Sequence, residues 1–233
     1  MQTGKVIKHI VSWLKAYCDD ADLKGFVVGV SGGIDSAVTS TLCARTEKQV
    51  ILLSMPIYQD PGQLSLAQQH IEWLEQNHGQ ATMANTRSRM RMVTLYAFST
   101  HHRMLVVGTG NKVEDFGVGF YTKYGDGGVD ILPIADLTKS EIYAIGSELG
   151  IGKEIMDASP TDGLWDDNRT DERQIGATYA ELEWAMQFEV ESGDDGQLDS
   201  RQKEVLSIYR RFRQANRHKM DPIPVCKIPE AMR

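Results

Sequence analysis

Residues 25–36 read Gly25-Phe-Val-Val-Gly-Val-Ser-Gly-Gly-Ile-Asp-Ser36, and they carry the clearest indication of the fold. Its first six residues form a mostly apolar run that is typical of a buried strand. Gly32 and Gly33 then allow a tight turn, and residues from Ser36 to about Arg45 are predicted to form a helix. A strand, a glycine-rich turn and a helix in this order favour an α/β protein with a ligand at the turn.

The turn from Ser31 to Ser36 has the features of a phosphate site. A helix N-terminus offers unpaired N–H groups and the positive end of a dipole, and the two serine hydroxyls add donors. Asp35 puts a carboxylate beside the expected phosphates, which favours Mg²⁺ as the bridging ion. The pattern is not a Walker loop, because no lysine follows the glycines. The alternative is a plain glycine turn in which Ser36 only caps the helix.

Further apolar runs extend this unit along the chain. They predict buried strands at 49–54 and 104–108, and a shorter extended piece at 130–133. Helices are expected at 7–17, 36–45, 61–77, 87–99, 138–149 and 202–217, with Thr138 and Glu141 forming a capping box and Gly150 as the stop. Continuously apolar strands that alternate with helices predict an α/β fold with a parallel sheet covered on both faces. Ligands of such sheets bind at the carboxyl ends of the strands.

The overall composition is that of a globular protein with one domain spanning 1–233. The chain has 233 residues, 41% of them hydrophobic and 24% charged, and a net charge of −7, which does not favour nucleic acid as a partner. Its three cysteines form no CxxC pair, and Cys43 is expected to be buried. The N-terminus resembles no signal peptide and no apolar run is long enough for a membrane, so a cytoplasmic location is expected.

Residues 157–172 are polar and rich in turns, and residues 194–197 form another break in the pattern. The first stretch, 157–172, is expected to form a mobile lid over the site, with a solvated surface loop as the alternative. A helical C-terminal segment with a basic face is expected at 197–219.

Two segments between the strands carry further candidate ligand groups. Arg87, Arg89 and Arg91 alternate on a predicted helix and should point in different directions toward a ligand or an interface, with a solvated basic surface as the alternative. Thr109 and Glu114 follow the third apolar strand. They should therefore lie near the first turn, with Glu114 as a second carboxylate for the metal.

Two later segments add charged groups. Residues 120–130 are rich in glycine and aromatic side chains and hold Lys123 and Asp130, which suggests an ordered pocket rather than a flexible loop. Lys139 stands at a helix start, where the dipole disfavours a cation unless a phosphate is bound.

The turn at 31–36 resembles that of the N-type ATP pyrophosphatases, which also include GMP synthetases, asparagine synthetases and tRNA-thiolating enzymes. The motifs RxRM, VVGTxNxxE, TKYGDGGVD, PIADLTK and PTDGL resemble those of the ammonia-dependent NAD synthetases within that superfamily. This resemblance spans nearly the whole chain and implies a Rossmann-like three-layer fold of the adenine nucleotide alpha hydrolase-like type.

The resemblance also implies roles for individual residues. ATP would be held by Gly29, Val30, Ser31, Gly32, Gly33, Ile34, Asp35, Ser36, Thr109, Lys139 and Thr161. Deamido-NAD would be held by Arg89, Lys123, Asp130, His218 and Lys219, and Mg²⁺ by Asp35 and Glu114. Asp35, Lys139 and Asp130 are the implied catalytic residues.

The implied reaction is the ATP-dependent amidation of deamido-NAD to NAD through an acyl-adenylate, with ammonia as nitrogen donor and AMP and pyrophosphate as products. The implied assembly is a homodimer, and neither a nucleic acid nor a membrane is an expected partner. Two alternatives remain open: another adenylating enzyme, such as a GMP synthetase core, or a non-catalytic nucleotide-binding protein. The chain departs from the family near 78–85, because this short segment cannot supply the strand and crossover expected there.

Overall fold

The computed structural model covers the whole chain and describes residues 1–31, 33–53, 55, 80–160, 170–191, 193, 195–223 and 226, with only the backbone at 80–83. Its sheet contains three parallel strands in the order β2-β1-β3. β1 (Gly25–Gly29) lies between β2 (Gln49–Leu53) and β3 (Leu105–Val107). A parallel bridge between Val107 and Ile131 continues the sheet, so the extended piece expected at 130–133 is present as a single bridge.

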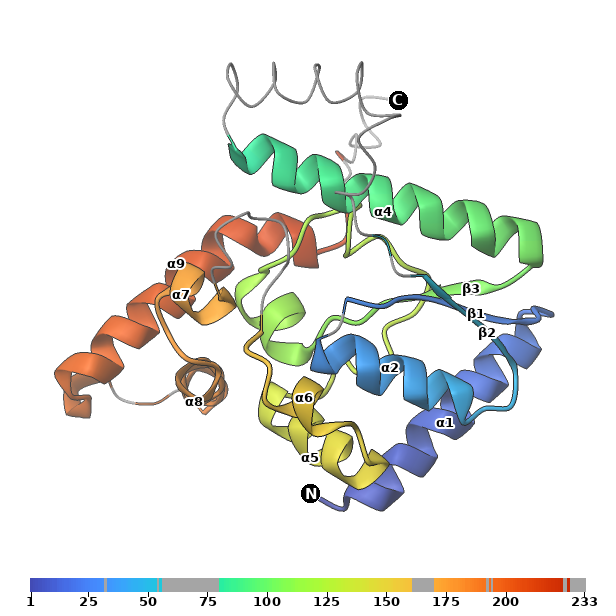
Figure 1. The fold of residues 1–233 in the computed structure, drawn as a ribbon. Coiled ribbons are helices and arrows are strands. Elements are labelled where there is room, and N and C mark those ends of the chain that lie inside the picture. Colours follow the sequence, from blue (N-terminus) through green and yellow to red (C-terminus); the bar gives the residue numbers. More distant parts are fainter. Residues whose placement is uncertain are drawn as a thin grey trace, which may run out of the picture.

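Helices cover both faces of this sheet, as predicted (Figure 1). α4 (Gln80–His102) lies across one face. On the other face lie α1 (Thr3–Asp20) and α2 (Ile34–Ala44), followed outward by α5 (Lys139–Leu149). The main apolar core fills the space between the sheet and these three helices. It includes Leu14, Cys18, Phe26, Val28, Val38, Leu42, Cys43, Leu105, Ile134, Ile142 and Ile145.

The strand order reverses at the carboxyl end of β1. The chain leaves β1 through α2 and adds β2 on one side, and it later adds β3 on the other side. At such a reversal of strand order, the loops after the two diverging strands separate and leave room for a ligand. Here those loops are 30–33, which precedes α2, and 108–111, which precedes η1 (Lys112–Val118), a short π-helix.

A second apolar core lies beside the first. It is built by η1, α7 (Asp171–Ile175), α8 (Tyr179–Val190) and α9 (Ser200–Met220). Its buried side chains include Val113, Val118, Ile175, Leu182, Ala185, Val205, Leu206 and Tyr209. α6 (Lys153–Met156) and the short η2 (Asp195–Gln197) complete the described helices.

Several predicted boundaries are confirmed, and one helix was not predicted. Thr138 and Glu141 form the expected capping box of α5, and Gly150 ends that helix in the left-handed region at φ 75°. The helix that was not predicted is α8, whose N-terminal capping box and buried Leu182 make it part of the second core. Gln80–Ala84 already lie in α4, so the strand missing from the family pattern is not in them. The helix expected at 61–77 lies outside the described residues.

Candidate active site

The turn before α2 presents an uncapped helix N-terminus. Gly33 is the N-cap residue, with extended backbone at φ −83° and ψ 163°, and no side chain among the described residues caps the helix. The hydroxyls of Ser31 and Ser36 lie 3.2 Å apart, and Ser36 Oγ donates to the Gly33 carbonyl at 3.0 Å. The first N–H groups of α2 therefore face a cradle lined by two hydroxyls, as an anion site requires. Gly32 lies outside the described residues.

Two carboxylates and one lysine meet beside this turn. Lys139 Nζ donates to Asp35 Oδ2 at 2.6 Å and to Glu114 Oε1 at 3.1 Å. These residues are 104 and 25 positions from Lys139 in sequence, and they come from three elements that meet at the carboxyl edge of the sheet. The structure thus brings together Asp35, Glu114 and Lys139, three residues predicted from different motifs.

Local capping explains how each of these side chains is aimed. Asn111 Oδ1 accepts from the Val113 and Glu114 amides at 3.1 and 3.0 Å, which starts η1 and orients Glu114. The capping box at Thr138 starts α5, so that Lys139 is its first residue. Gly110 precedes this turn, and a Cβ at Gly110 would lie 1.9 Å from Asp115 Oδ2. Gly110, the second glycine of the VVGTGNKVE segment, therefore leaves room for the buried carboxyl group of Asp115.

Tyr179 joins the second core to this cluster. Its hydroxyl donates to Glu114 Oε1 and lies 3.3 Å from Asp171 Oδ2, and its ring centroid lies 4.6 Å from Lys139 Nζ. Sequence reasoning missed Tyr179 because it stands in no recognised ligand motif. The only signal nearby was Thr178 with Glu181, a capping box that predicts a helix start but no functional role.

Burial changes the protonation behaviour of the cluster. Burial and the neighbouring Glu114 carboxylate raise the pKa of Asp35 to about 6, although Lys139 opposes this shift. Burial disfavours the charged form of Lys139, but Glu114 and Asp35 outweigh burial and raise its pKa above the usual range. Burial, with Glu114 and Asp171 nearby, also raises the pKa of Tyr179, so its hydroxyl stays protonated and can only donate to Glu114.

The donor set fits a divalent metal ion. Asp35 Oδ1 is buried and has no hydrogen-bond partner among the described residues, which leaves a lone pair for a ligand. Among the same residues, no group of three or more His, Cys, Asp or Glu side chains is placed to hold a metal ion. Two carboxylates alone suit Mg²⁺, which fills its other positions with water and phosphate oxygens.

The predicted substrate residues form a second group, near the end of α9. Lys123 Nζ donates to the carbonyl of His218, and Arg89 Nη2 lies 3.5 Å from the carbonyl of Lys123. Lys219 Nζ donates to the carbonyls of Gly119 and Tyr121, at 2.9 and 2.7 Å. These contacts bind the last turn of α9 to the glycine-rich segment.

Asp130 lies apart from that group, next to β3. Its Oδ1 accepts from the Tyr96 hydroxyl at 3.0 Å and its Oδ2 from the Val106 amide at 2.8 Å. Both oxygens therefore fix the segment 120–130 to the sheet and to α4. Thr109 is half-buried two residues after β3, and Thr161 lies outside the described residues. The lid expected at 157–172 also lies mostly outside them.

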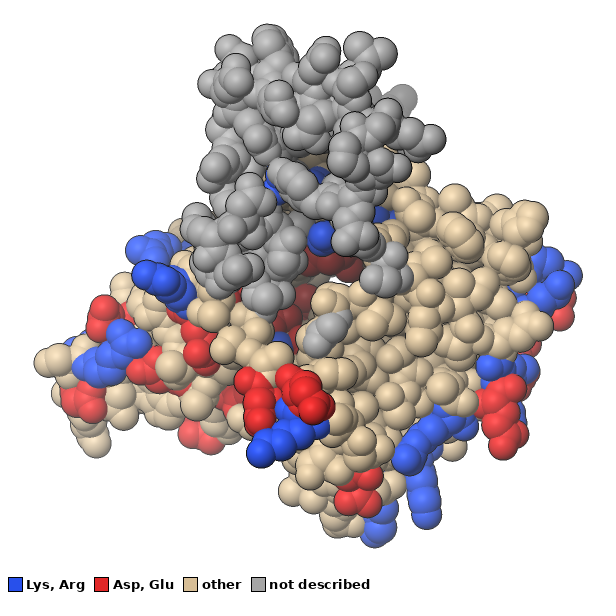
Figure 2. Space-filling view, in the orientation of Figure 1, with Lys and Arg blue, Asp and Glu red and all other residues tan. Residues whose placement is uncertain are grey.

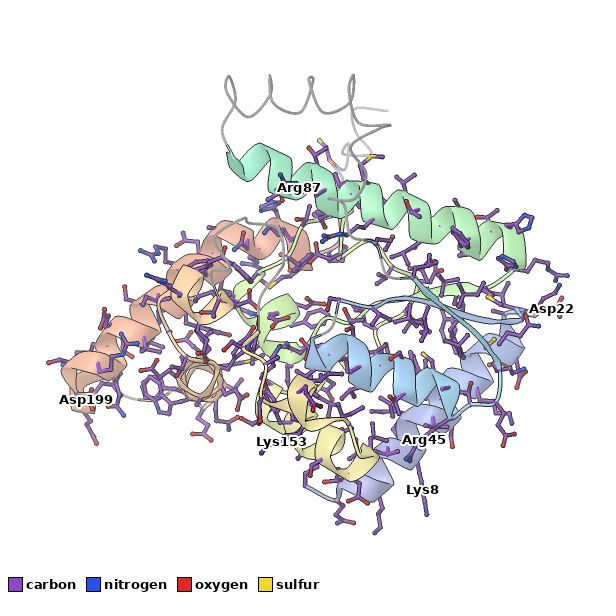
Figure 3. The ribbon with its side chains drawn as sticks, viewed as in Figure 1. Lys8, Asp22, Arg45, Arg87, Lys153 and Asp199 are labelled. Carbon is purple, nitrogen blue, oxygen red and sulfur yellow. The ribbon has the colours of Figure 1, made fainter. Side chains whose placement is uncertain are left out.

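The three arginines of α4 point in different directions, as predicted. Arg87 is buried, Arg91 is half-buried and Arg89 is exposed. Figure 3 shows Arg87 toward the N-terminal end of α4. In Figure 2, acidic and basic side chains gather in a hollow near the middle of the visible face. No helix in the described ranges is both long enough and apolar enough to cross a membrane.

The family model and the similar proteins all indicate the same family. The NAD synthase family model matches residues 6–81 and 64–223. The NH(3)-dependent NAD(+) synthetase of Alkaliphilus metalliredigens is 32% identical over 257 aligned positions, which cover 96% of this chain and 99% of that protein. The NH(3)-dependent NAD(+) synthetase of Archaeoglobus fulgidus is 32% identical and is covered completely, as is this chain.

Solved structures share the fold. The NMN synthetase of Francisella tularensis superimposes with a TM-score of 0.79 at 28% identity and covers 99% of both chains. The NH3-dependent NAD synthetase of Campylobacter jejuni superimposes with a TM-score of 0.75 at 23% identity, over 97% of this chain and all of that one, which supports the fold alone. These similarities confirm the expected Rossmann-like, adenine nucleotide alpha hydrolase-like fold.

Proposed function

Because this chain belongs to the NAD synthase family, we propose that it converts deamido-NAD to NAD, with ATP as co-substrate and ammonia as nitrogen donor. It is thus a ligase that forms a carbon–nitrogen amide bond. One observation in particular supports the proposal: Asp35, Glu114 and Lys139 meet beside an uncapped helix N-terminus at the carboxyl edge of the sheet. The family match favours this function over a GMP synthetase core and over a non-catalytic nucleotide-binding protein.

The chemistry explains why such a site is needed. A nicotinate carboxylate is a poor electrophile because its leaving group resembles hydroxide. Attack of one carboxylate oxygen on the α-phosphorus of ATP forms an acyl-adenylate and releases pyrophosphate. Ammonia then attacks the acyl carbon, and the carbon–oxygen bond to AMP breaks as the amide forms. The nitrogen loses its extra proton to solvent, so little general-base catalysis is required.

The residues of the phosphate cradle carry the first step. We assign the amides at the start of α2 and the hydroxyls of Ser31 and Ser36 to the ATP phosphates, where they stabilise the negative charge that develops as pyrophosphate departs. Lys139 adds a full positive charge at the same place. Asp35 and Glu114 would hold Mg²⁺, which when bound supplies Lewis-acid stabilisation of the phosphate oxygens. Gly29, Val30, Gly32, Gly33, Ile34, Thr109 and Thr161 complete the proposed ATP site.

The segment around 120–130 and the end of α9 supply the proposed dinucleotide site. Arg89, Lys123, His218 and Lys219 add positive charge or donors for the pyrophosphate bridge of deamido-NAD. Asp130 remains our candidate for orienting the attacking ammonia. An Asp130→Asn variant tests this role, since unchanged turnover with ammonia at a limiting concentration would refute it.

We also propose a homodimer in a reducing, cytoplasmic compartment. Cys18 and Cys43 are free and buried, and Cys226 is free and exposed, which suits a compartment that keeps thiols reduced. The exposed apolar side chains of α4, Met90 and Val93, favour a dimer interface.

A second candidate substrate is the mononucleotide counterpart, nicotinic acid mononucleotide. The similarity to the NMN synthetase of Francisella tularensis, with a TM-score of 0.79 over nearly the whole of both chains, favours it. The reacting carboxylate and the proposed adenylation site are the same for both substrates. They differ only in whether an adenylyl half must also be held.

One assay tests both candidates. Purified protein is supplied with ATP, Mg²⁺, ammonium and either deamido-NAD or nicotinic acid mononucleotide, and the products are separated. We expect NAD, AMP and pyrophosphate, with a larger kcat/KM for the dinucleotide. A larger kcat/KM for the mononucleotide would favour the second candidate, and formation of ADP and phosphate would refute adenylation.

A further inference from the structure

A single ammonium group fills the gap between the two candidate metal carboxylates. Lys139 Nζ lies 2.6 Å from Asp35 Oδ2 and 3.1 Å from Glu114 Oε1. The Lys139 side chain is only 4% exposed, and those of Asp35 and Glu114 are 17% and 15% exposed. A metal ion bound to the same two oxygens would lie against this ammonium, and two cations so close repel strongly where water is excluded.

The Glu114 carboxylate is held in place by groups other than this lysine. Glu114 Oε1 accepts from the Tyr179 hydroxyl as well as from Lys139, and the backbone of Glu114 is fixed by the Asn111 cap. Asp35 is in the first turn of α2, and its Oδ1 has no hydrogen-bond partner among the described residues. Glu114 can therefore keep its position when the ammonium leaves, and Asp35 still has a free lone pair for a metal ion.

We propose that Lys139 is a stand-in cation: it neutralises Asp35 and Glu114 in the nucleotide-free protein, and Mg²⁺ displaces it when the metal–nucleotide enters. Lys139 is the first residue of α5, so its flexible side chain can swing to the phosphates while the helix stays in place. The phosphates accept the displaced ammonium, which offsets the cost of removing it from the carboxylates. The inference rests on the proposed function, because it takes the metal and the nucleotide from it.

Two consequences follow for binding. The metal alone should bind weakly, because it must expel a buried, doubly paired ammonium. The metal and the nucleotide should bind cooperatively, since each one favours the arrangement that the other requires. A lysine that only contacts phosphate, without competing for the carboxylates, would predict neither effect.

Mn²⁺ binding to the nucleotide-free protein tests the competition directly. The unbound Mn²⁺ is measured by electron paramagnetic resonance during titration of the wild type and of Lys139→Met, which has similar length but no charge. We expect the variant to bind Mn²⁺ about tenfold more tightly or better, since the competing cation is gone. An unchanged or weaker affinity would overturn the proposal.

Matched variants separate this effect from general changes of charge. Lys112→Met removes a lysine that lies two positions from Glu114 in the sequence. The Lys112 ammonium pairs with the exposed Asp136 at 3.0 Å. This variant should leave Mn²⁺ affinity unchanged within about twofold, because an exposed charge in water acts weakly. Lys139→Arg keeps the cation and should bind no more tightly than the wild type. Tightening in either control would count against a specific exchange.

Folding of the variants is followed by their thermal midpoints. Lys139→Met leaves two carboxylates without a cation, so Mn²⁺ should raise its midpoint more than that of the wild type, and an equal rise would contradict the exchange. Lys139→Gln has two N–H donors but no charge, and it should also bind Mn²⁺ more tightly than the wild type. It replaces the methionine variant if that variant does not fold.

The cooperativity is measured with a non-hydrolysable ATP analogue. The analogue should increase the Mn²⁺ affinity of the wild type by a factor about ten times larger than the factor measured for Lys139→Met. Equal factors in the two proteins would refute the proposed movement of the Lys139 ammonium from the carboxylates to the phosphates. NAD formation by the same wild-type preparation is assayed separately. If the protein forms NAD but Lys139 does not compete with Mn²⁺, only this inference is overturned. If Lys139 competes with Mn²⁺ but no NAD forms, the proposed function is overturned.

Discussion

At the residue scale, the site depends on a few side chains whose positions the motifs anticipated in part. Asp35 could be predicted because an aspartate after two glycines at a helix start has an evident use beside phosphates. Glu114 and Lys139 could be predicted only as candidates, since their meeting with Asp35 depends on how three elements converge. Tyr179 could not be predicted, because its contact with Glu114 depends on the docking of a separate core.

Glu114 gives the first prediction at this scale. Glu114→Gln keeps the shape of the side chain but removes its charge, so both Lys139 and the proposed Mg²⁺ ion lose a partner. We expect a loss of about 3 kcal/mol of transition-state stabilisation, which is roughly 100-fold in kcat/KM. Steady-state kinetics measures it, with Asp136→Asn as a control because the Asp136 side chain is 98% exposed. Equal kcat/KM in Glu114→Gln and wild type would contradict the role of Glu114.

Tyr179 gives a prediction that distinguishes positioning from packing. Tyr179→Phe keeps the ring and removes the hydroxyl that fixes Glu114 Oε1. We expect the Mg²⁺ concentration for half-maximal rate to rise by about tenfold, since a hydrogen bond to a charged group is lost. Tyr209→Phe removes a buried hydroxyl from the same core without touching Glu114, and should leave this Mg²⁺ requirement unchanged. The same shift in both variants would indicate a general loss of packing instead.

At the scale of elements, a short stretch of sequence predicts a helix or strand correctly where its apolar run or cap is local. β1, α2 and the capping box of α5 are close to their predicted bounds because apolar runs, glycine turns and Thr-x-x-Glu act locally. α8 was missed because its helix forms within a polar neighbourhood and is stabilised by packing of Leu182 and Ala185 against α9 and η1. Tertiary packing of this kind cannot be recognised from a short stretch of sequence.

The loop between β3 and η1 gives a prediction about stability. A methyl group at Gly110 would lie 1.9 Å from the buried Asp115 carboxyl, which has little room to move. Gly110→Ala should therefore lower the free energy of unfolding by about 1–3 kcal/mol. Gly4→Ala is the control, because its nearest neighbour would lie 3.9 Å away and alanine suits a helix. Denaturant unfolding measures both, and an equally stable Gly110→Ala protein would contradict the account of this loop.

The contact between α8 and α9 gives a prediction that depends on pH. Glu181 accepts from Arg201 Nε at 2.7 Å and from Nη2 at 2.9 Å, and this pairing, with the Thr178 amide, lowers the pKa of Glu181 to about 2. A carboxylate whose folded pKa is below its unfolded value of 4.5 stabilises the fold above pH 4.5. That contribution is then lost as the pH falls from 4.5 to 2.

Glu181→Gln keeps the capping acceptor and removes the charge. It should lower the free energy of unfolding by about 1 kcal/mol at pH 7, a modest amount because the pair is partly exposed. The difference from wild type should shrink as the pH falls toward 2. Glu204→Gln changes a more exposed partner of the same arginine and should have a smaller effect. A pH-independent difference for Glu181→Gln would contradict the ion-pair explanation.

At the scale of the whole molecule, the strand order reverses at β1, and Tyr179 of the second core contacts Glu114 in the site that follows the sheet. The parallel α/β architecture could be predicted, because each strand is continuously apolar and each connection is helical. The second core and its contribution to the site could not, since they depend on contacts between segments more than 60 positions apart, such as Tyr179 with Glu114.

The outer surface of α4 gives a prediction about assembly. Met90 and Val93 are 58% and 55% exposed and lie three residues apart, so they share one side of the helix and favour an interface. Val93→Glu should convert the expected dimer to a monomer in sedimentation velocity. Val190→Glu, at a more exposed apolar position at the end of α8, should leave the dimer intact. A wild-type protein that is monomeric at micromolar concentration would contradict the proposal.

In the proposed reaction this site adenylates the nicotinate carboxylate, and isotope labelling tests that step directly. Deamido-NAD with ¹⁸O in both carboxylate oxygens is converted with ATP, Mg²⁺ and ammonia, and the products are examined by mass spectrometry. If the carboxylate attacks the α-phosphorus, one labelled oxygen must appear in AMP and the other must stay in the amide of NAD. Label in inorganic phosphate, or unlabelled AMP beside labelled NAD, would contradict adenylation at this site.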